Sequence, residues 1–100
     1  MTCKAIILLS RRDDMTHEDF LAWWLTEHAP LAAQLPDVRR IVFNPTAEHD
    51  DIDGVSELWF DSRASFDAAY SSELGKQVAA DSMAHVRSRV RLFVEEHAIV

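Results

Sequence analysis

The sequence predicts an α+β fold in which four antiparallel strands form one sheet and two helical regions cover one of its faces. Four short apolar segments, rich in β-branched and aromatic residues, are typical of strands. Helical periodicity separates the first segment from the second and the third from the fourth, whereas turn formers separate the second from the third. The resulting order β-α-β-β-α-β is that of the ferredoxin-like, or split βαβ, arrangement.

The first helical region has the clearest start in the chain. Thr16 is expected to be its N-cap, because its hydroxyl can accept a hydrogen bond from a backbone N–H of the first turn. Asp19 follows three residues later as the acid of a capping box, and Met15 and Phe20 occupy the positions of a hydrophobic staple. We therefore predict a helix that begins directly after Thr16.

Apolar side chains and one histidine recur along this helix at intervals of 4, 4, 3 and 4 residues. At about 100° per residue, this spacing forms one inward-facing stripe, which consists of Phe20, Trp24, His28, Leu31 and Leu35. Pro30 lacks a backbone N–H and disfavours helical geometry at the residue before it, so we expect the helix to kink or restart just after His28. Such a break would leave room for a cavity beside the imidazole.

The four predicted strands comprise residues 4–9, 39–44, 55–60 and 90–94. The second helical region is expected to begin after Ser62, to break near Gly75 and to continue over residues 76–85.

Residues 45–54 combine turn formers with four acids and one histidine, and we interpret them as a solvated hairpin loop. The alternative is a calcium-binding loop. An EF-hand loop that started at His49 would have Phe60 at the position of the bidentate glutamate, so the hairpin loop is the better interpretation.

The predicted strands are apolar on both faces, although helices can cover only one face of the sheet. We expect a single domain spanning residues 1–100, and a chain of this length has no further element to cover the second face. A second copy packed sheet to sheet would cover it. The sequence therefore predicts a homodimer in which two sheets enclose one barrel-like core.

Composition argues against several classes of partner. The net charge is −7, with 10 basic residues dispersed among 17 acidic ones, and this balance disfavours binding to nucleic acid. No apolar run approaches the roughly 20 residues of a membrane helix, so we expect no membrane partner and a cytoplasmic location. The single cysteine, Cys3, excludes an intrachain disulfide.

The sequence contains no glycine-rich phosphate loop and no pair of histidines at the spacing of a metal site. We therefore expect neither a cofactor nor a bound metal. His17, in the first turn of the helix, and His49, in the acidic loop, are expected to be exposed.

The pattern W-x-x-x-H-A-P-L-x-x-x-L-P, which runs from Trp24 to Pro36, resembles the EthD family, as do RRIVFN at 39–44 and ELWFDS at 57–62. The resemblance covers most of the chain and implies a small dimeric α/β-barrel protein. The family includes proteins linked to degradation of ethyl tert-butyl ether, cofactor-free methylmuconolactone isomerases and fungal polyketide-tailoring lyases. The implied ligand is a small hydrophobic or aromatic-derived molecule from a catabolic or biosynthetic pathway.

The resemblance also indicates candidate residues. The family histidine falls on His28, which would act as acid and base in proton transfer, and the family asparagine falls on Asn44. Ile41 stands where many members have tyrosine, so a phenolic donor is missing there. With the helical stripe, these positions predict His28 as the catalytic residue and, as ligand-binding residues, Phe20, Trp24, Leu31 and Asn44.

Two functional hypotheses follow. In the first, the protein is a cofactor-independent isomerase or lyase that acts on a small aromatic-derived or polyketide-like metabolite through His28. In the second, it is a non-catalytic binding or accessory protein, and His28 is a core histidine with satisfied hydrogen bonds. The sequence leaves the partner of His28 open, because it does not fix which way Asn44, Ser56 and Glu57 face.

Overall fold

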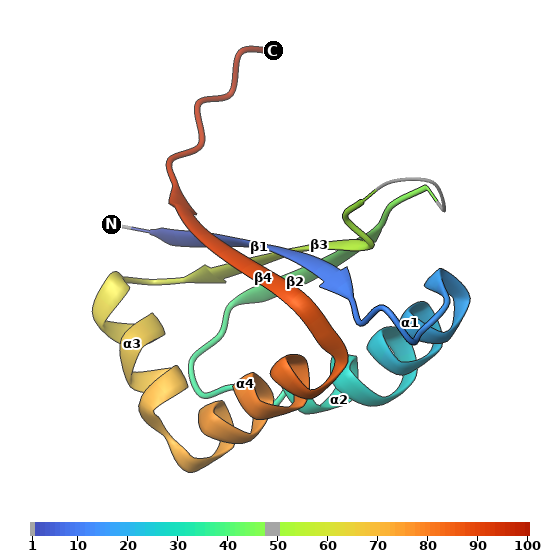
Figure 1. The fold of residues 1–100 in the computed structure, drawn as a ribbon. Coiled ribbons are helices and arrows are strands. Elements are labelled where there is room, and N and C mark those ends of the chain that lie inside the picture. Colours follow the sequence, from blue (N-terminus) through green and yellow to red (C-terminus); the bar gives the residue numbers. More distant parts are fainter. Residues whose placement is uncertain (1, 48–50) are drawn as a thin grey trace.

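The computed structural model of the chain describes residues 2–47 and 51–100. Within these residues, four strands pair antiparallel in the order β2-β3-β1-β4 (Figure 1). β1 is Cys3–Arg11, β2 is Arg40–Pro45, β3 is Gly54–Phe60 and β4 is Val86–Val94. All four predicted strands are present, and β4 departs most from its expected bounds because it begins directly after the last helix.

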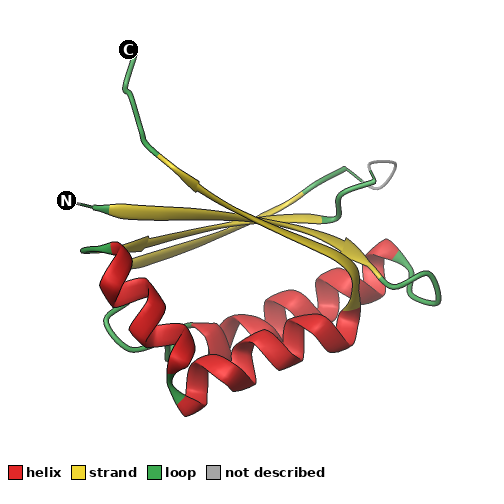
Figure 2. Ribbon diagram, turned by 60° about the vertical axis from the view of Figure 1, so that its left-hand side comes forward, coloured by secondary structure: helices red, strands yellow, loops and turns green. Residues whose placement is uncertain are grey.

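The helices lie on one face of this sheet. α1 (His17–Trp23), the π-helical turn η1 (Trp24–His28) and α2 (Ala29–Ala32) form one continuous rod, and α3 (Arg63–Ser71) and α4 (Glu73–His85) follow β3. Figure 2 shows the helices in a layer below the sheet, with the other face bare. The predicted α+β, ferredoxin-like arrangement is confirmed. Of the helices described, none has the length and apolar composition of a membrane span.

The core lies between the sheet and the helix layer. Alternate residues of β1 and β3 are buried, as expected for strands that pack one face against helices. The largest fully buried apolar side chains are Trp24, Phe20, Phe60, Phe66 and Leu9. Aromatic groups from the first helical rod and from β3 therefore form the centre of the core.

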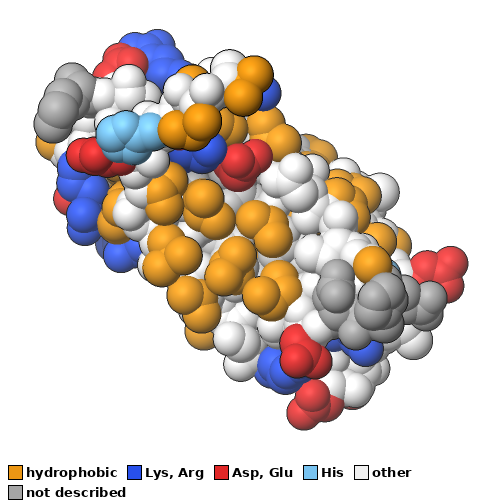
Figure 3. Space-filling model, turned by 90° about the horizontal axis from the view of Figure 1, so that it is seen from above, with side chains coloured by type: hydrophobic (Ala, Val, Ile, Leu, Met, Phe, Trp, Pro, Cys, Tyr) orange, Lys and Arg blue, Asp and Glu red, His pale blue; other side chains and the backbone are white. Residues whose placement is uncertain are grey.

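The open face of the sheet carries apolar side chains on its central strands. The pairing of β1 with β4 places five of them together, and we call them the open-face patch: Ile6, Leu8, Val90, Leu92 and Val94. Figure 3 shows hydrophobic side chains gathered in the middle of this face and charged groups toward its ends. Phe93 points to the other side, where its ring packs edge-on against Phe66 with ring centroids 5.0 Å apart.

The first helical rod stays continuous at Pro30, and of the two predicted outcomes it shows the restart: the π-helical turn ends at His28 and α-helical geometry resumes at Ala29. The backbone stays helical through the proline, and the turn before it widens: the Ala29 N–H donates to the carbonyl of Trp24, five residues earlier. A wider turn accommodates a proline that has no N–H and would crowd the carbonyl four residues before it.

The wide turn also alters the buried stripe. Trp23 and His28, five residues apart, lie on the same face with ring centroids 5.0 Å apart. His28 is buried, whereas Leu31 is only half-buried and Ala32 takes the core position. The predicted stripe is therefore right at its other positions and wrong at Leu31.

The second helical region breaks at Ser72 and not near Gly75. Ser62 caps α3 as predicted, and Ser72 caps α4 by accepting a hydrogen bond from the Gly75 N–H at 3.1 Å. Gly75 lies inside α4, where a Cβ would collide with the backbone of Ala69 and Tyr70 on α3. The glycine thus permits close packing of the two helices and does not end one.

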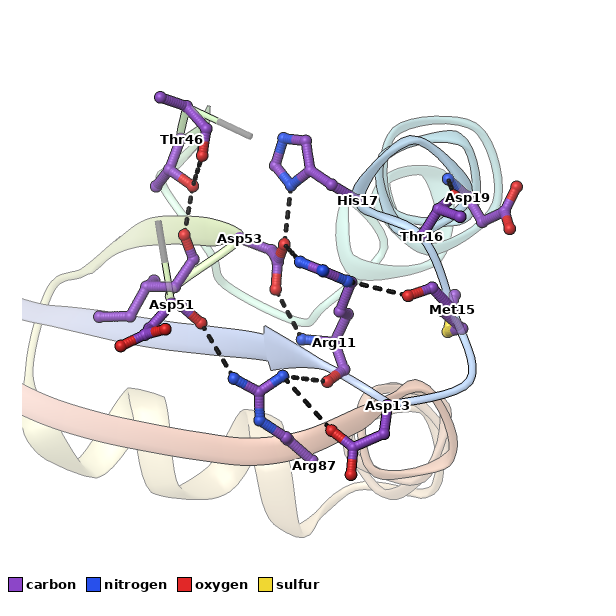
Figure 4. A network of polar contacts seen from close by, with 12 residues as sticks. Arg11, Asp13, Met15, Thr16, His17, Asp19, Thr46, Asp51, Asp53 and Arg87 are labelled. Atoms are coloured by element: carbon purple, nitrogen blue, oxygen red, sulfur yellow. Dashed lines mark hydrogen bonds and ion pairs between the residues drawn. The ribbon is translucent and has the colours of Figure 1, made fainter. Parts of the chain in front are cut away.

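A buried polar network ties the end of β1 to the start of α1. The fully buried Asp53 carboxylate accepts hydrogen bonds from the Arg11 N–H at 2.8 Å, the Arg11 guanidinium at 2.7 Å and His17 Nδ1 at 2.7 Å (Figure 4). Burial raises the pKa of Asp53, but these hydrogen bonds outweigh it and hold the pKa below its ordinary value.

This network corrects two expectations. His17 is buried and not exposed, and the 45–54 loop is anchored at Asp53 instead of being solvated throughout. His49 lies outside the described residues.

Candidate functional site

A small enclosed cavity lies between the sheet and the helices, beside η1. Its volume is about 10 Å³, which is room for about one water molecule. Most of its wall is apolar, and its polar lining comes from His28, Ser56, Tyr70, Ser82 and Arg89. None of the described residues that line it is a carboxylate. Wider hollows, of about 520 and 440 Å³, are open to solvent at the far end of the sheet and do not include His28.

His28 lies between α4 and this cavity. Its Nδ1–H donates to Oδ2 of Asp81 at 2.8 Å, and its Nε2 lies 3.3 Å from the hydroxyl of Ser82. Because the carboxylate accepts from Nδ1, the neutral imidazole carries its hydrogen there and has a lone pair on Nε2. A basic nitrogen at a cavity with a carboxylate behind it is the pairing of a general base and its orienting group.

Burial lowers the pKa of His28 below its ordinary value. The hydrogen bond to Asp81 and the charge of that carboxylate oppose burial, whereas the charges of His85 and Arg89 act in the same direction as burial. At neutral pH the imidazole is therefore uncharged and can accept a proton at Nε2.

Asp81 is held by further contacts with aromatic groups. The indole N–H of Trp23 donates to Oδ1 of Asp81 at 3.4 Å. His85 stacks on Trp23 with ring centroids 4.1 Å apart, and its Nδ1 lies 2.7 Å from the backbone carbonyl oxygen of Asp81. These contacts fix the carboxylate that orients His28.

Two buried N–H groups on the cavity's lining residues have no hydrogen-bond partner among the described residues. They are the indole N–H of Trp24 and the Nε–H of Arg89. Burial raises the pKa of Tyr70, and the neighbouring Arg89 opposes this rise. The cavity therefore combines an imidazole base, two hydroxyl side chains, a phenol and a cation.

Phe43 separates the cavity from a groove on the surface. Its ring stacks on Trp24 with centroids 4.3 Å apart and planes 4° apart, and it lies 6.1 Å from the ring of His28. The same phenylalanine lines a solvent-open groove of about 240 Å³, together with Leu25, Ala29, Ala33 and Ile41. Phe43 is half-buried on the edge strand β2 and lines both the cavity and the groove.

The residues proposed from the sequence lie in different places. His28 and Trp24 both line the cavity. Phe20 lies one layer behind, with its ring 5.5 Å from that of Trp24, and Leu31 does not reach the lining. Asn44 is exposed on the open face, where its amide donates to the Val55 carbonyl and to Glu57. Their roles in ligand binding stay predictions.

Four polar residues of the site were missed from the sequence: Asp81, Ser82, Arg89 and Tyr70. Strand alternation could have indicated Arg89, because it pairs with the buried Leu9 and therefore faces the helices. Ile41 does not line the cavity, whereas Tyr70 of α3, the single tyrosine of the chain, does.

Comparison with known proteins identifies the family of this chain. A sequence model of the EthD domain matches residues 12–86, which span the first helical rod, β2, β3 and both later helices. The chain belongs to the EthD family. A search of curated proteins found no matching sequence.

Solved structures share the fold of this EthD chain. An ethyl tert-butyl ether D family protein from Bacillus halodurans has a TM-score of 0.84 at 22% identity, over 97% of this chain and 100% of that one. A dimeric ferredoxin-like protein of unknown function from Thermobifida fusca has a TM-score of 0.77 at 19% identity, over 94% and 90% of the chains. SnoaB, a cofactor-independent oxygenase from Streptomyces nogalater, has a TM-score of 0.75 at 11% identity, over 99% and 96%.

Among the described residues, no three His, Cys, Asp or Glu side chains gather in a way that could hold a metal ion. The expectation that the EthD chain binds no metal stays a prediction.

Proposed function

We propose that this EthD protein is a cofactor-independent enzyme that transfers a proton within a small hydrophobic or aromatic-derived molecule, as an isomerase or lyase. One observation carries the proposal: Nδ1 of His28 is held by Asp81, while Nε2 lies at a cavity lined by Ser82, Tyr70 and Arg89. A core histidine would also need a partner for each ring nitrogen, so the polar groups that favour a reactive site are those beyond these partners, Tyr70 and Arg89.

In the proposed step, Nε2 of His28 removes a proton from an activated C–H of the bound molecule. The electron pair of that bond moves into the conjugated system, and Asp81 stabilises the imidazolium. Return of the proton to another carbon gives an isomer, whereas expulsion of a leaving group gives a lyase product. The lowered pKa of His28 supports the first half of the step, because the base is uncharged at neutral pH.

The fold of SnoaB, described as a cofactor-independent oxygenase, supports the idea that such a scaffold can host chemistry without a cofactor. The proposed assembly is a homodimer, since the open-face patch would otherwise remain exposed and a neighbour of the same fold is described as dimeric.

A non-catalytic binding or accessory role is the second candidate. The observation in its favour is that Phe43 fills the space over Trp24 and leaves a cavity of only about 10 Å³. In that case the hydrogen bond from His28 to Asp81 would hold η1 against α4, and the imidazole would exchange no proton with a ligand.

Deuterium exchange separates the two candidates without knowledge of the product. The protein is incubated in deuterated buffer with an unsaturated five-membered lactone or a hydroxylated aromatic ketone, and NMR follows exchange at the activated C–H. We expect exchange above the buffer rate, its loss in His28→Gln, and its retention in His97→Gln, which removes an exposed imidazole that does not line the cavity. Equal exchange in His28→Gln and the unmodified protein would refute the proton-transfer role.

A further inference from the structure

Two buried donors at the cavity indicate what kind of ligand the site accepts. The N–H groups of Trp24 and Arg89 are buried and have no partner among the described residues. A buried donor without an acceptor is costly, so such groups are usually paired with protein, water or ligand. Both side chains line the cavity that also contains Nε2 of His28. An acceptor in this cavity would lie among the side chains that carry these donors.

The charge around the cavity restricts the acceptor further. Arg89 is the positively charged group of its lining, and none of the described lining residues is a carboxylate. Asp81 is engaged by His28 and Trp23 and does not line the cavity. An anionic oxygen would therefore be favoured over a neutral one, because it would meet an unopposed guanidinium at a water-poor site.

The position of Phe43 indicates how the rest of the ligand fits. Its ring lies almost parallel to Trp24, between the cavity and the groove formed with Leu25, Ala29, Ala33 and Ile41. A flat conjugated ring of similar size would stack on Trp24 in the same way if the Phe43 side chain turned outward from its edge strand. The groove and the cavity would then form one continuous site that ends at His28.

From these observations we infer that the site binds a planar conjugated oxygen anion, such as an aromatic carboxylate, phenolate or enolate. Its oxygen accepts a hydrogen bond from Arg89, and its ring replaces that of Phe43 on the Trp24 face. The inference rests on the proposed function for the location of the site, and it adds the chemical class of the ligand. In a proton-transfer reaction the Arg89 guanidinium stabilises the enolate formed when His28 removes the proton.

The test compares two probes of the same shape, benzoate and the uncharged benzamide, by calorimetry at pH 7.5. We expect benzoate to bind the unmodified protein at least about tenfold more tightly than benzamide, because a charge-assisted hydrogen bond is about twice as strong as a neutral one. Phe43→Ala should bind both probes more tightly, since it removes the ring that occupies the site.

Three variants locate the effect. Arg89→Met should remove the preference for benzoate, and Trp24→Phe, which keeps an aromatic ring for the ligand to stack on, should preserve it. Arg91→Met is the matched control, because Arg91 lies on the same face of β4 but rests on Phe66 and Phe93 and does not line the cavity. It should keep the preference.

Equal binding of the two probes, no binding of either to Phe43→Ala, or a preference that survives in Arg89→Met would overturn the inference. The comparison of probes on the unmodified protein needs no variant, so a misfolded Arg89→Met would not leave the question open. If the anion preference is absent while His28→Gln still abolishes deuterium exchange, the ligand class is wrong and the proposed function stands. If the anion preference is present and deuterium exchange does not depend on His28, the ligand class stands and the proposed function is wrong.

Discussion

Nδ1 of His28 lies 2.8 Å from Oδ2 of Asp81 and joins the π-helical turn to α4 across 53 residues of sequence. The contact determines which ring nitrogen carries the hydrogen and which is left at the cavity. The wide turn that precedes Pro30 brings Trp23 onto the same face, where its indole N–H also reaches Asp81. The wide turn before Pro30 thus helps to bring Trp23 and His28 to the same carboxylate, that of Asp81.

Asp81→Asn tests the role of the carboxylate. The amide oxygen can still accept from Nδ1, but it cannot stabilise an imidazolium, so we expect deuterium exchange to fall by about a hundredfold or more. The free energy of unfolding should fall by only about 1 kcal/mol. Asp67→Asn, an exposed substitution on α3, is the control for both measurements.

The pH dependence of stability should report on His28. Its folded pKa is lowered by burial, so the folded state binds fewer protons than the unfolded state over the interval between the two pKa values. The contribution of the neutral imidazole is therefore complete above the ordinary histidine pKa and is lost as pH falls through the folded pKa. Urea unfolding at a series of pH values should show this loss, and His28→Gln should reduce the slope in that interval. An unchanged slope in the variant would contradict the lowered pKa.

The open-face patch should hold two chains together. Light scattering with size exclusion should give twice the 11.4 kDa chain mass, and Leu92→Asp should yield monomer or unfolded protein, because a charge buried in an apolar interface costs several kcal/mol. Leu25→Asp is the matched control: Leu25 is 44% exposed, against 46% for Leu92, but it lies on the helix layer. A stable monomer of the unmodified protein at micromolar concentration would refute the dimer.

Asp53→Asn should lower the free energy of unfolding by about 3 kcal/mol, because it leaves Arg11 without its buried counter-charge and weakens the acceptor of the His17 hydrogen bond. The exposed Asp51→Asn should change it by less than about 0.5 kcal/mol. Chemical denaturation of the two variants side by side measures the difference. If Asp53→Asn lowered the free energy of unfolding by less than about 1 kcal/mol, water molecules would be replacing the hydrogen bonds of the Asp53 carboxylate.

The fold was predictable because its elements carry local signals. Thr16 and Ser62 cap helices where their spacing indicated, and apolar segments with β-branched residues identified all four strands. The π-helical turn was not predictable from periodicity, since a regular stripe assumes a constant number of residues per turn. The shift from Leu31 to Ala32 follows from that one irregularity.

The candidate site was predictable only in part, because its polar groups come from segments far apart in sequence. Spacing alone places His28 on an inward face. Its partner Asp81 lies on a helix whose register against η1 is set by tertiary packing, and His17 and Asp53 meet for the same reason. Asn44, carried over by family resemblance, instead faces the open side of the sheet.

Nitrogen NMR of labelled histidine tests the central claim most directly, because it reports the tautomer and the pKa of His28 without any substrate. The signal is assigned by its absence in His28→Gln. We predict that at pH 7.5 the hydrogen resides on Nδ1, that Nε2 is unprotonated, and that the ring titrates below the ordinary histidine value. A hydrogen on Nε2 of the neutral ring, or titration at or above the ordinary value, would contradict a base that is held by Asp81 and directed at the cavity.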